Sequence, residues 1–563
     1  MKIHKKYIAS AVAILCMTGS WSAFADAQEL VVVPNDVSND SGIQMNRMQQ
    51  YLERERVQRQ IAEDRAAHQA KAKQEQTKQT QPEENIRFML KRIDTGSSTV
   101  LSAEEIAAVT KPYEGKDVTI ADMYTVVEKI NAIYREKGYM TCRAFLQPQT
   151  IEDGVVKLLL IEGKTGTYAV QGNQYTRSSY IQHRLHFTAG DVANTKQINE
   201  DMLRFNATNS TQLRIVMKAG QQPGTTDYEI MAYEPQREMW TLFEDNAGSD
   251  TSGQYRTGLF YTTKSLSGTC DPLSVGTVWS EGMKAANVTY SHYLGRRGTK
   301  MNLLYSTNAV KTVDGAYKDK VKGHANSFAM GFTHPLLVNE TTRSELSLDY
   351  NNQTSKSDFI VNPYRFNIVD DAVQDVTLGL AVTKYGNSHV YYQKHSYVRG
   401  YRKSTPSTHQ EETQHFGFYK FNGLYQKSYT AGRLLSMRAD AQWSGTDGLS
   451  SSRQFYIGGM YSVRGYKENY LGGDSGFTFS TEYQVPVINS RMNAFAFFDY
   501  GHIYSSGQSD DAARILASTG VGLRCAVGKN MSASLTLGVP LRREFPAETV
   551  SKTRLHFVVS GQF

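Results

Sequence analysis

Cysteine and proline are scarce in this 563-residue chain, which contains 4 and 13 of them. Cys16 lies near the N-terminus, while Cys142, Cys270 and Cys525 lie far apart and are odd in number. This spacing indicates neither a disulfide framework nor a metal site, so we expect unpaired structural thiols. The net charge of +7 is mild for this length and does not indicate a nucleic-acid partner.

Long apolar runs are also scarce. No segment of the mature chain approaches the roughly 18 apolar residues that a membrane helix needs. Residues 1–25 begin with lysines, continue with a short apolar stretch and close on the small residues Ala23 and Ala25. That pattern is typical of a Sec signal peptide, which is too short and wrongly flanked to be a membrane helix.

Aromatic residues and glycine are abundant, with 34 Tyr, 23 Phe and 44 Gly, and the segment 554–563 alternates in polarity. The apolar positions of this segment, the last of them aromatic, are Leu555, Phe557, Val559, Gly561 and Phe563. The positions between them are polar except for Val558. Because successive side chains of a strand point to opposite faces, this segment predicts a strand with one apolar and one polar face.

The same alternation occurs in the preceding segments 515–527 and 532–542. A polar interior with an apolar exterior inverts the usual arrangement of soluble proteins and suits a bilayer. In hydrocarbon every backbone group must be paired, so strands can cross a membrane only as a closed barrel. The sequence therefore favours a transmembrane antiparallel β-barrel that closes on a strand ending at Phe563. A large soluble all-β protein is the alternative.

The mature N-terminus predicts a helix followed by a linker. The stretch from about Gly42 to Ala70 is rich in helix formers and has only a thin apolar stripe. Such a helix is either solvated and partly frayed, or it lies in a polar cavity and needs no apolar face. The run from Lys71 to Glu84 cannot bury a core, so it is interpreted as a linker.

Two small α/β modules are predicted between the linker and the barrel. Ser102 and Glu105 have the spacing of a capping box, and Gly138 ends a longer amphipathic helix. The expected elements are strands near 86–90, 142–146 and 155–161 with helices from about 102 and 120, then strands near 168–170, 213–217 and 228–232 with helices near 178–185 and 195–205. This β-α-α-β-β order occurs twice, which indicates tandem interaction modules whose sheet edges can receive an extended peptide.

With these parts in this order, the chain resembles the TpsB class of two-partner secretion transporters, the haemolysin activation/secretion proteins, within the BamA-like superfamily. The resemblance implies a plug helix, a linker, two polypeptide-transport-associated (POTRA) domains and a barrel of 16 strands, about 20 residues for each strand and turn. It also implies a place in the outer membrane of a Gram-negative bacterium, with the POTRA domains in the periplasm. The implied division is a signal peptide at 1–25, an N-terminal segment with the plug helix at 26–71, a linker at 72–85, POTRA 1 at 86–163, POTRA 2 at 164–236 and the barrel at 237–563.

Two short motifs strengthen the resemblance. They are Val463-Arg464-Gly465-Tyr466, similar to the VRGY/F motif of a family loop that folds back into the barrel, and Phe497-x-Asp499-x-Gly501, similar to the family's FxDxG strand motif. In the family the arginine of the first motif pairs with the aspartate of the second. The resemblance therefore implies an ion pair between Arg464 and Asp499, with glycines that permit close backbone approach.

A second copy of the first motif is present at Val398-Arg399-Gly400-Tyr401. No FxDxG sequence follows it after one strand length, whereas Phe497-x-Asp499-x-Gly501 follows the later copy. We therefore expect the earlier copy to lie at a strand end and Arg464, rather than Arg399, to face Asp499.

The parts predict a pore that recognises an unfolded exoprotein in the periplasm through POTRA domains and secretes it without ATP. The expected partners are an exoprotein of haemolysin, adhesin or contact-dependent toxin type, outer-membrane lipid, and the barrel assembly machinery through the C-terminal strand. The sequence contains no phosphate-binding loop, metal cluster or nucleophile–base–acid set, so neither an enzyme nor a cofactor is expected. A BamA-like assembly factor is the alternative, although such proteins usually carry more POTRA modules and lack a helix–linker start. A passive porin would need no α/β modules.

Overall fold

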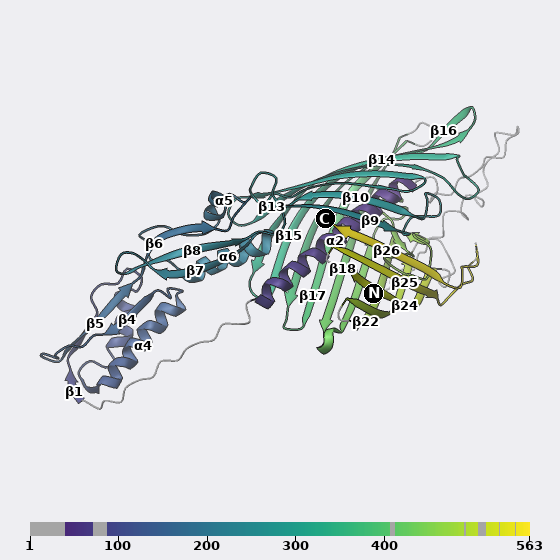
Figure 1. Cartoon of the computed structure of the whole chain (residues 1–563). Coiled ribbons are helices and arrows are strands. Elements are labelled where there is room, and N and C mark those ends of the chain that lie inside the picture. Colours follow the sequence, from purple (N-terminus) through teal and green to yellow (C-terminus); the bar gives the residue numbers. More distant parts are fainter. Residues whose placement is uncertain are drawn as a thin grey trace.

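The computed structural model places a helix, two α/β modules and a barrel along the chain (Figure 1). The residues that it describes are 40–70, 87–405, 411–488, 491–504, 514–528, 530–545 and 548–563. The predicted signal peptide and the predicted linker lie outside these described residues.

The barrel consists of 16 antiparallel strands in a closed ring, as the sequence predicted. They are β9 (Glu238–Asp245), β10 (Arg256–Thr263), β11 (Leu273–Trp279), β12 (Met283–Leu294), β13 (Thr299–Lys311), β14 (Val321–Val338), β15 (Thr342–Val361), β16 (Tyr364–Tyr385), β17 (His389–Ser404), β18 (Glu412–Ser428), β19 (Leu434–Ser444), β22 (Ser475–Ile488), β23 (Met492–Tyr504), β24 (Ile515–Val527), β25 (Met531–Pro540) and β26 (Arg554–Gln562). β26 pairs with β9 and closes the ring. Asn246 extends this seam, since its side chain donates to the Leu555 carbonyl at 2.7 Å and accepts from the Phe557 N–H at 2.9 Å.

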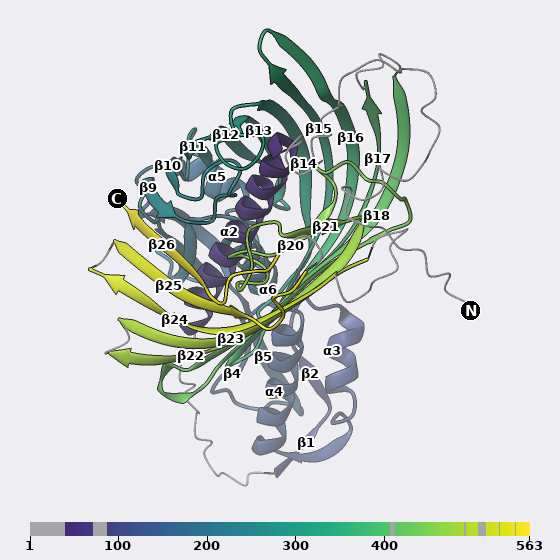
Figure 2. The same cartoon turned by 90° about the vertical axis from the view of Figure 1, so that its right-hand side faces the viewer.

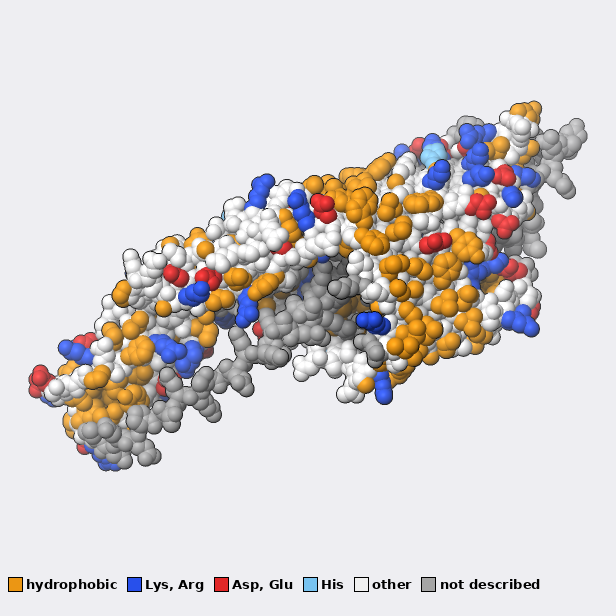
Figure 3. Space-filling view, in the orientation of Figure 1, with side chains coloured by type: hydrophobic (Ala, Val, Ile, Leu, Met, Phe, Trp, Pro, Cys, Tyr) orange, Lys and Arg blue, Asp and Glu red, His pale blue; other side chains and the backbone are white. Residues whose placement is uncertain are grey.

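The two faces of the barrel strands differ as the alternation predicted. Leu555 and Val559 are 51% and 41% exposed, whereas His556 between them is 1% exposed. The outward side chains form the broad hydrophobic band over the barrel in Figure 3. Cys525 falls in the outward register of β24, and Cys142 and Cys270 are buried; all three thiols are free, which confirms the prediction for them.

The barrel wall is much higher on one side than on the other (Figures 1 and 2). Strands β9 to β11 have 7 or 8 residues. Strands β14 to β18, the raised wall, have 16 to 22 residues. Because a membrane crossing takes about 9–11 residues, the raised wall extends well beyond the bilayer at the end away from the α/β modules.

Helix α2 (Asp40–Ala70) lies inside the barrel and runs along its axis (Figure 2). Polar contacts attach it to β13, β14 and β15: the Asn308 amide donates to the Ser41 carbonyl at 2.8 Å, and the Gln49 amide donates to Ser327 Oγ at 3.0 Å. Of the two interpretations of this stretch, the helix in a polar cavity is therefore correct. No helix among the described residues is both long enough and apolar enough to span a membrane.

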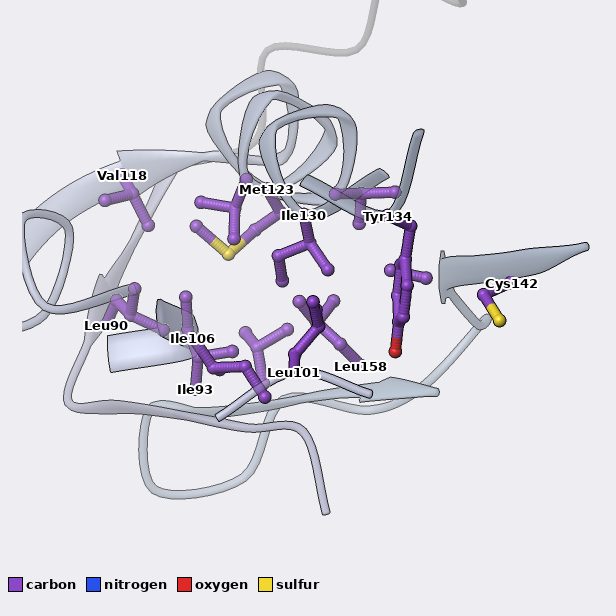
Figure 4. Packing of buried hydrophobic residues seen from close by; sticks show 14 residues of the cluster. Leu90, Ile93, Leu101, Ile106, Val118, Met123, Ile130, Tyr134, Cys142 and Leu158 are labelled. Atoms are coloured by element: carbon purple, nitrogen blue, oxygen red, sulfur yellow. The ribbon is translucent and has the colours of Figure 1, made fainter. Parts of the chain in front are cut away.

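The first α/β module begins after the undescribed linker. Its elements are β1 (Arg87–Leu90), β2 (Arg92–Asp94), α3 (Ala103–Thr110), β3 (Lys116–Thr119), α4 (Ile120–Glu136), β4 (Cys142–Leu146) and β5 (Val155–Glu162). The capping box expected at Ser102 and Glu105 is present. Figure 4 shows Met123, Ile130 and Tyr134 of α4 packed toward the sheet. β2 and β3, strands of 3 and 4 residues, were not predicted.

The second module is attached to the barrel. It contains β6 (Lys164–Gln171), α5 (Ser178–His183), α6 (Thr195–Thr208), β7 (Gln212–Ala219) and β8 (Thr225–Tyr233). The Arg177 N–H donates to the Gly268 carbonyl in the β10–β11 turn at 2.9 Å. The Cys270 thiol of the same turn donates to Thr211 Oγ1 at 3.4 Å, and burial raises the pKa of this thiol. The turn of the barrel is thus part of the core of the second module.

Candidate functional site

The segment 445–474 between β19 and β22, called the inner loop here, folds back into the barrel. Its ends form a short hairpin of β20 (Phe455–Ile457) and β21 (Leu471–Gly473). Ile457, Val463 and Tyr466 are fully buried and pack against Ile503 and Leu516 of the barrel wall. This apolar cluster holds the loop against the inner face of the barrel wall.

Arg464 of the inner loop forms a two-pronged ion pair with Asp499 of β23. Its Nε donates to Oδ2 and its Nη2 donates to Oδ1, both at 2.8 Å. The Arg464 backbone N–H also donates to Oδ2 at 3.1 Å. Asp499 is completely buried, so its charge depends on these donors. The contact that the two motifs predicted is therefore present.

The other residues of the strand motif complete this arrangement. The Arg464 guanidinium lies 3.5 Å from the centroid of the Phe497 ring, a close cation–π contact. Phe497 and Asp499 point inward, 4% and 0% exposed, whereas Phe498 between them is 39% exposed toward the outside. The FxDxG motif therefore supplies a stacking surface and a carboxylate on one face of β23.

Neighbouring charges belong to the same cluster but were not predicted. Arg464 Nη1 donates to Glu482 of β22 at 2.8 Å, and Glu482 also pairs with Arg524 of β24. His556 Nε2 lies 2.7 Å from the Arg464 carbonyl oxygen. The only signal in the sequence was a charged residue at a lumen-facing position of an alternating strand, which identifies the face but not the partner.

Close packing requires the glycine of the loop motif, whereas a Cβ at Gly501 of the strand motif would lie 3.1 Å from side-chain atoms of Ile457 and Val463 and not against backbone. A Cβ at Gly465 would lie 2.7 Å from Ser518 Cβ and 2.8 Å from Pro540 N. On the wall opposite, a Cβ at Gly538 would lie 2.3 Å from the Arg464 carbonyl oxygen. Backbone therefore packs directly on backbone where the loop meets β24 and β25. Tyr466, the last residue of the motif, adds a hydrogen bond to this contact, in which its hydroxyl donates to the Arg542 carbonyl at 2.9 Å.

The earlier copy of the motif is part of a strand and not of a loop. Val398 to Tyr401 lie within β17 and pair with both β16 and β18, so the expected strand end is wrong. Val398 is buried on the inner face while Arg399 is exposed on the outer face. The continuous ladder of the raised wall explains this, because β17 extends past the motif toward the extracellular end.

The plug helix contacts the inner loop on the side opposite the wall. Arg47 pairs with Glu468 at 2.9 Å, and the Arg54 Nη1 donates to the Tyr461 carbonyl at 2.8 Å. A cavity of about 460 Å³ remains between the helix, the loop and strands β19 to β26. The inner loop is thus held between the barrel wall and helix α2.

The C-terminal residue completes the barrel seam. The Phe563 N–H donates to the Trp240 carbonyl and the Trp240 N–H donates to the Phe563 carbonyl, both at 2.8 Å. The Phe563 ring is 56% exposed on the outer face.

A 16-stranded barrel with an apolar exterior, a polar lumen closed by a helix, an inward loop and attached α/β modules defines an outer-membrane transporter. The family model for the haemolysin secretion/activation proteins ShlB, FhaC and HecB matches residues 224–525, and the ShlB-type POTRA domain model matches residues 88–163. The chain belongs to this haemolysin secretion/activation family.

Relatives with assigned names agree with the family. The chain is 23% identical over 495 residues to the heme/hemopexin transporter protein HuxB of Haemophilus influenzae, which covers 82% of this chain and 85% of the relative. It is 23% identical over 490 residues to the outer membrane transporter CdiB of Escherichia coli, covering 81% and 79%. The solved structure of CdiB from Escherichia coli covers 93% of this chain and 99% of its own, with a TM-score of 0.71 at 20% identity. That of CdiB from Acinetobacter baumannii gives 0.67 at 16% identity, covering 94% and 100%.

The protein is therefore a two-partner secretion transporter of the outer membrane, with POTRA structure on the periplasmic side. The family consists of secretion transporters and is not a family of enzymes. Its match also favours secretion over the alternative of a BamA-like assembly factor.

Proposed function

We propose that this transporter captures an unfolded exoprotein in the periplasm through its α/β modules and passes it through the barrel without ATP, after the plug helix leaves the lumen. The exoprotein is of the haemolysin, adhesin or contact-dependent toxin type. Both modules act as POTRA domains, at 86–163 and 164–236, and the chain has no catalytic activity. The C-terminal strand with Phe563 is the segment that the barrel assembly machinery reads.

The observation that carries this proposal is how poorly a helix satisfies its site in the lumen. Beneath α2, both side-chain polar atoms of Asn287 and the Ser306 hydroxyl are buried and have no hydrogen-bond partner among the described residues. The backbone of a helix is bonded internally and does not supply those partners, and the side chains of α2 bond to other wall residues such as Ser327. Since each unpaired buried polar group costs about 1–3 kcal/mol, the wall weakens the attachment of the plug.

Ion pairs account for much of the remaining attachment. Besides Arg47 with Glu468, α2 contributes Arg54 to Asp440 at 3.5 Å and Glu53 to Lys394 at 2.8 Å. The Arg54–Asp440 and Lys394–Glu53 pairs are partly exposed, where such contacts are weaker than in a dry core, whereas the Arg47–Glu468 pair is largely buried. A chain that enters from the periplasm can therefore displace the helix at a modest free-energy cost.

An exposed apolar pair of residues near the sheet edge supports capture in the first module. Its sheet has the order β2-β5-β4, which leaves β4 at an edge. Phe145 of β4 pairs across the strand with Leu159 of β5, and the two side chains are 42% and 40% exposed on the outer face. The Ala144 N–H and carbonyl on the edge of β4 already bond to the Asn131 side chain, so an extended apolar segment would bind by burying its side chains on Phe145 and Leu159.

The test begins with the protein that disappears from the medium when this gene is deleted. Phe145→Ser with Leu159→Ser should lower secretion of that protein several-fold while the barrel still assembles. Thr125→Ser, an exposed change on α4 of the same module, serves as the matched control. Unchanged secretion by the double variant would contradict the capture site, and an unchanged set of secreted proteins in the deletion strain would contradict the transport function.

A further inference from the structure

The tip of the β15–β16 hairpin, the highest part of the raised wall, carries an apolar surface that faces the pore axis. The strand register shows on which face of the hairpin each side chain lies, because directly paired residues share a face. Phe359 pairs with Phe366, and Val361 pairs with Tyr364. These four residues continue the face of Gln353, Ser355 and Ser357, which line the lumen and are 1–3% exposed.

The apolar surface at the tip is largely exposed. Val361, Tyr364 and Phe366 are 47%, 66% and 51% exposed. Behind them Phe359 and Val321 are 7% and 3% exposed, and Tyr317 packs edge-on to Phe359 with ring centroids 6.2 Å apart. Figure 3 shows hydrophobic side chains at this outermost end of the barrel. The aromatic tip is therefore supported from behind and uncovered in front.

Next to this surface, β16 has an edge with no ladder partner among the described residues. β16 pairs with β15 as far as Tyr364, but its ladder with β17 starts only at Asp371 opposite Ser404. The last contact on that side is the Thr405 N–H, which donates to the Asp370 carbonyl at 2.9 Å. Among the described residues, none continues the ladder along Tyr364 to Val369. An unpaired edge of this kind is a template for one more strand.

We propose that this tip is the first docking site of the exoprotein outside the membrane: an extended apolar segment pairs with the free edge of β16 and buries side chains on Tyr364 and Phe366. The inference rests on the proposed transport of an unfolded chain. From Ser355 beside the plug to Val361 at the tip, the inner face of β15 rises by about 20 Å. A chain that leaves the polar lumen along this wall therefore meets its first apolar surface and its first unpaired strand edge together.

The position of the tip favours the exoprotein over other occupants. The tip lies beyond the bilayer, out of reach of lipid, and its four apolar residues lie on the inner face of the strands. Their side chains carry no charge, so the site suits the apolar positions of a β-forming segment and not a charged headgroup. Strand addition at this edge would hold the emerging chain in β-structure, and its own folding then draws the rest of the chain outward.

Photo-crosslinking tests the site without removing an aromatic residue. A benzoyl-phenylalanine at position 366 should crosslink to the secreted protein in exporting cells, whereas one at Asn367, which points outward, should not. Crosslinks from both positions, from neither, or only to a second copy of the transporter would overturn the proposal.

A variant tests the effect on folding. Tyr364→Ser with Phe366→Ser should delay the appearance of protease-resistant exoprotein at the cell surface about tenfold, the change that corresponds to 1.4 kcal/mol. Ile360→Ser, on the outer face of the same hairpin, should cause no delay. Equal kinetics of wild type and double variant would overturn the docking site. A wild type that exports no protein would instead overturn the proposed function on which it rests.

Discussion

At the scale of single residues, the Arg464–Asp499 pair explains why two short motifs can determine the position of a 30-residue segment. The pair is bidentate and stacked on Phe497, with Arg464 10% exposed and Asp499 fully buried. A buried ion pair adds little net stability compared with apolar packing, but loss of one partner leaves a buried charge unpaired. The pair therefore holds the inner loop in one place and does not simply strengthen the barrel.

Arg464→Ala should lower the free energy of unfolding by about 3–5 kcal/mol and strongly reduce secretion, because Asp499 loses its main donors. Arg464→Lys should reduce secretion in part, since an ammonium cannot form the two-pronged pair or stack on Phe497. Secretion is measured as exoprotein in the medium, with heat-modifiable mobility as the measure of assembled barrel. Arg399→Ala on the outer face of β17 is the control and should have little effect. An equal loss for Arg399→Ala would show that the motif acts through its sequence and not through this pair.

Gly538→Ala should displace the inner loop, because the new Cβ would lie 2.3 Å from the Arg464 carbonyl oxygen. We expect increased protease cleavage within 445–474 and lower secretion. Gly445→Ala, in the same loop with no atom within 4 Å of the added Cβ, should change neither the protease cleavage nor the secretion. Equal protease patterns for both variants would rule out the close backbone contact as a requirement.

At the scale of elements, the plug helix and the inner loop contact each other but are attached to the barrel in different ways. The loop is covalently part of the wall and has its own apolar cluster. The helix is attached by separate contacts, among them those of Arg47 and Arg54, whose partners Glu468 and Tyr461 belong to the loop. Movement of the helix therefore removes contacts from one side of the loop and leaves those with the wall intact.

Arg47→Ala with Arg54→Ala should raise the frequency of open events in planar bilayers, and deletion of 40–70 should raise the single-channel conductance without abolishing secretion. The reason is that both changes remove contacts that hold the helix in the lumen. Gln50→Ala is the control, because its amide bonds to Asn46 of the same helix. A deletion with wild-type conductance would show that α2 does not limit the pore.

The two α/β modules meet at a joint made of helix ends. The Gly138 carbonyl after α4 accepts from Thr195 Oγ1 at 2.7 Å at the start of α6. Asn194 caps α6 and also donates to the Lys137 carbonyl at 3.1 Å. The last carbonyls of one helix are thus satisfied by the first residues of the other, which aligns the modules.

Gly138→Ala should loosen this joint, since the new Cβ would lie 2.5 Å from Lys196 Cβ at a backbone φ of +88°. We expect faster limited proteolysis near 137–141 in the intact protein. Gly115→Ala has a similar φ of +74° but open space around the Cβ, so it separates backbone strain from the clash. Cleavage that increases equally in both variants would mean that strain alone, and not the contact with α6, is responsible.

At the scale of the whole molecule, the barrel is asymmetric in height and in attachment. The low side, β9 to β13, carries the second module on its periplasmic turns, and the raised wall lies further around the ring. The helix lies against β13, β14 and β15, where the two regions meet. A chain that passes from modules to exterior therefore has one continuous surface to follow.

The mature protein should fractionate with the outer membrane and migrate faster unheated than boiled on gels, because a closed ladder of 16 strands resists detergent at room temperature. Substitution of Val521, 57% exposed on the outer face, by Arg should reduce the heat-modifiable fraction, since a charge on the lipid face costs about 2–4 kcal/mol at mid-depth. Thr536→Ser on the lumen face serves as control. A protein that remains in the soluble fraction would contradict the fold.

Sequence by itself determined the two faces of the barrel strands, since strand periodicity assigned Leu555 and His556 to opposite faces. It predicted a helix at 42–70 but left open whether that helix is solvated or lies in a polar cavity. The resemblance of two motifs to those of a family implied the pair of Arg464 and Asp499. Tertiary structure alone decided which charges join that pair, since Glu482, Arg524 and His556 come from three strands that share no local pattern. It also decided that Val398 to Tyr401 continues a strand, because strand length depends on ladder partners from both neighbours. Local residues determine faces and turns, whereas non-local hydrogen bonds determine how far a strand extends and which side chains meet.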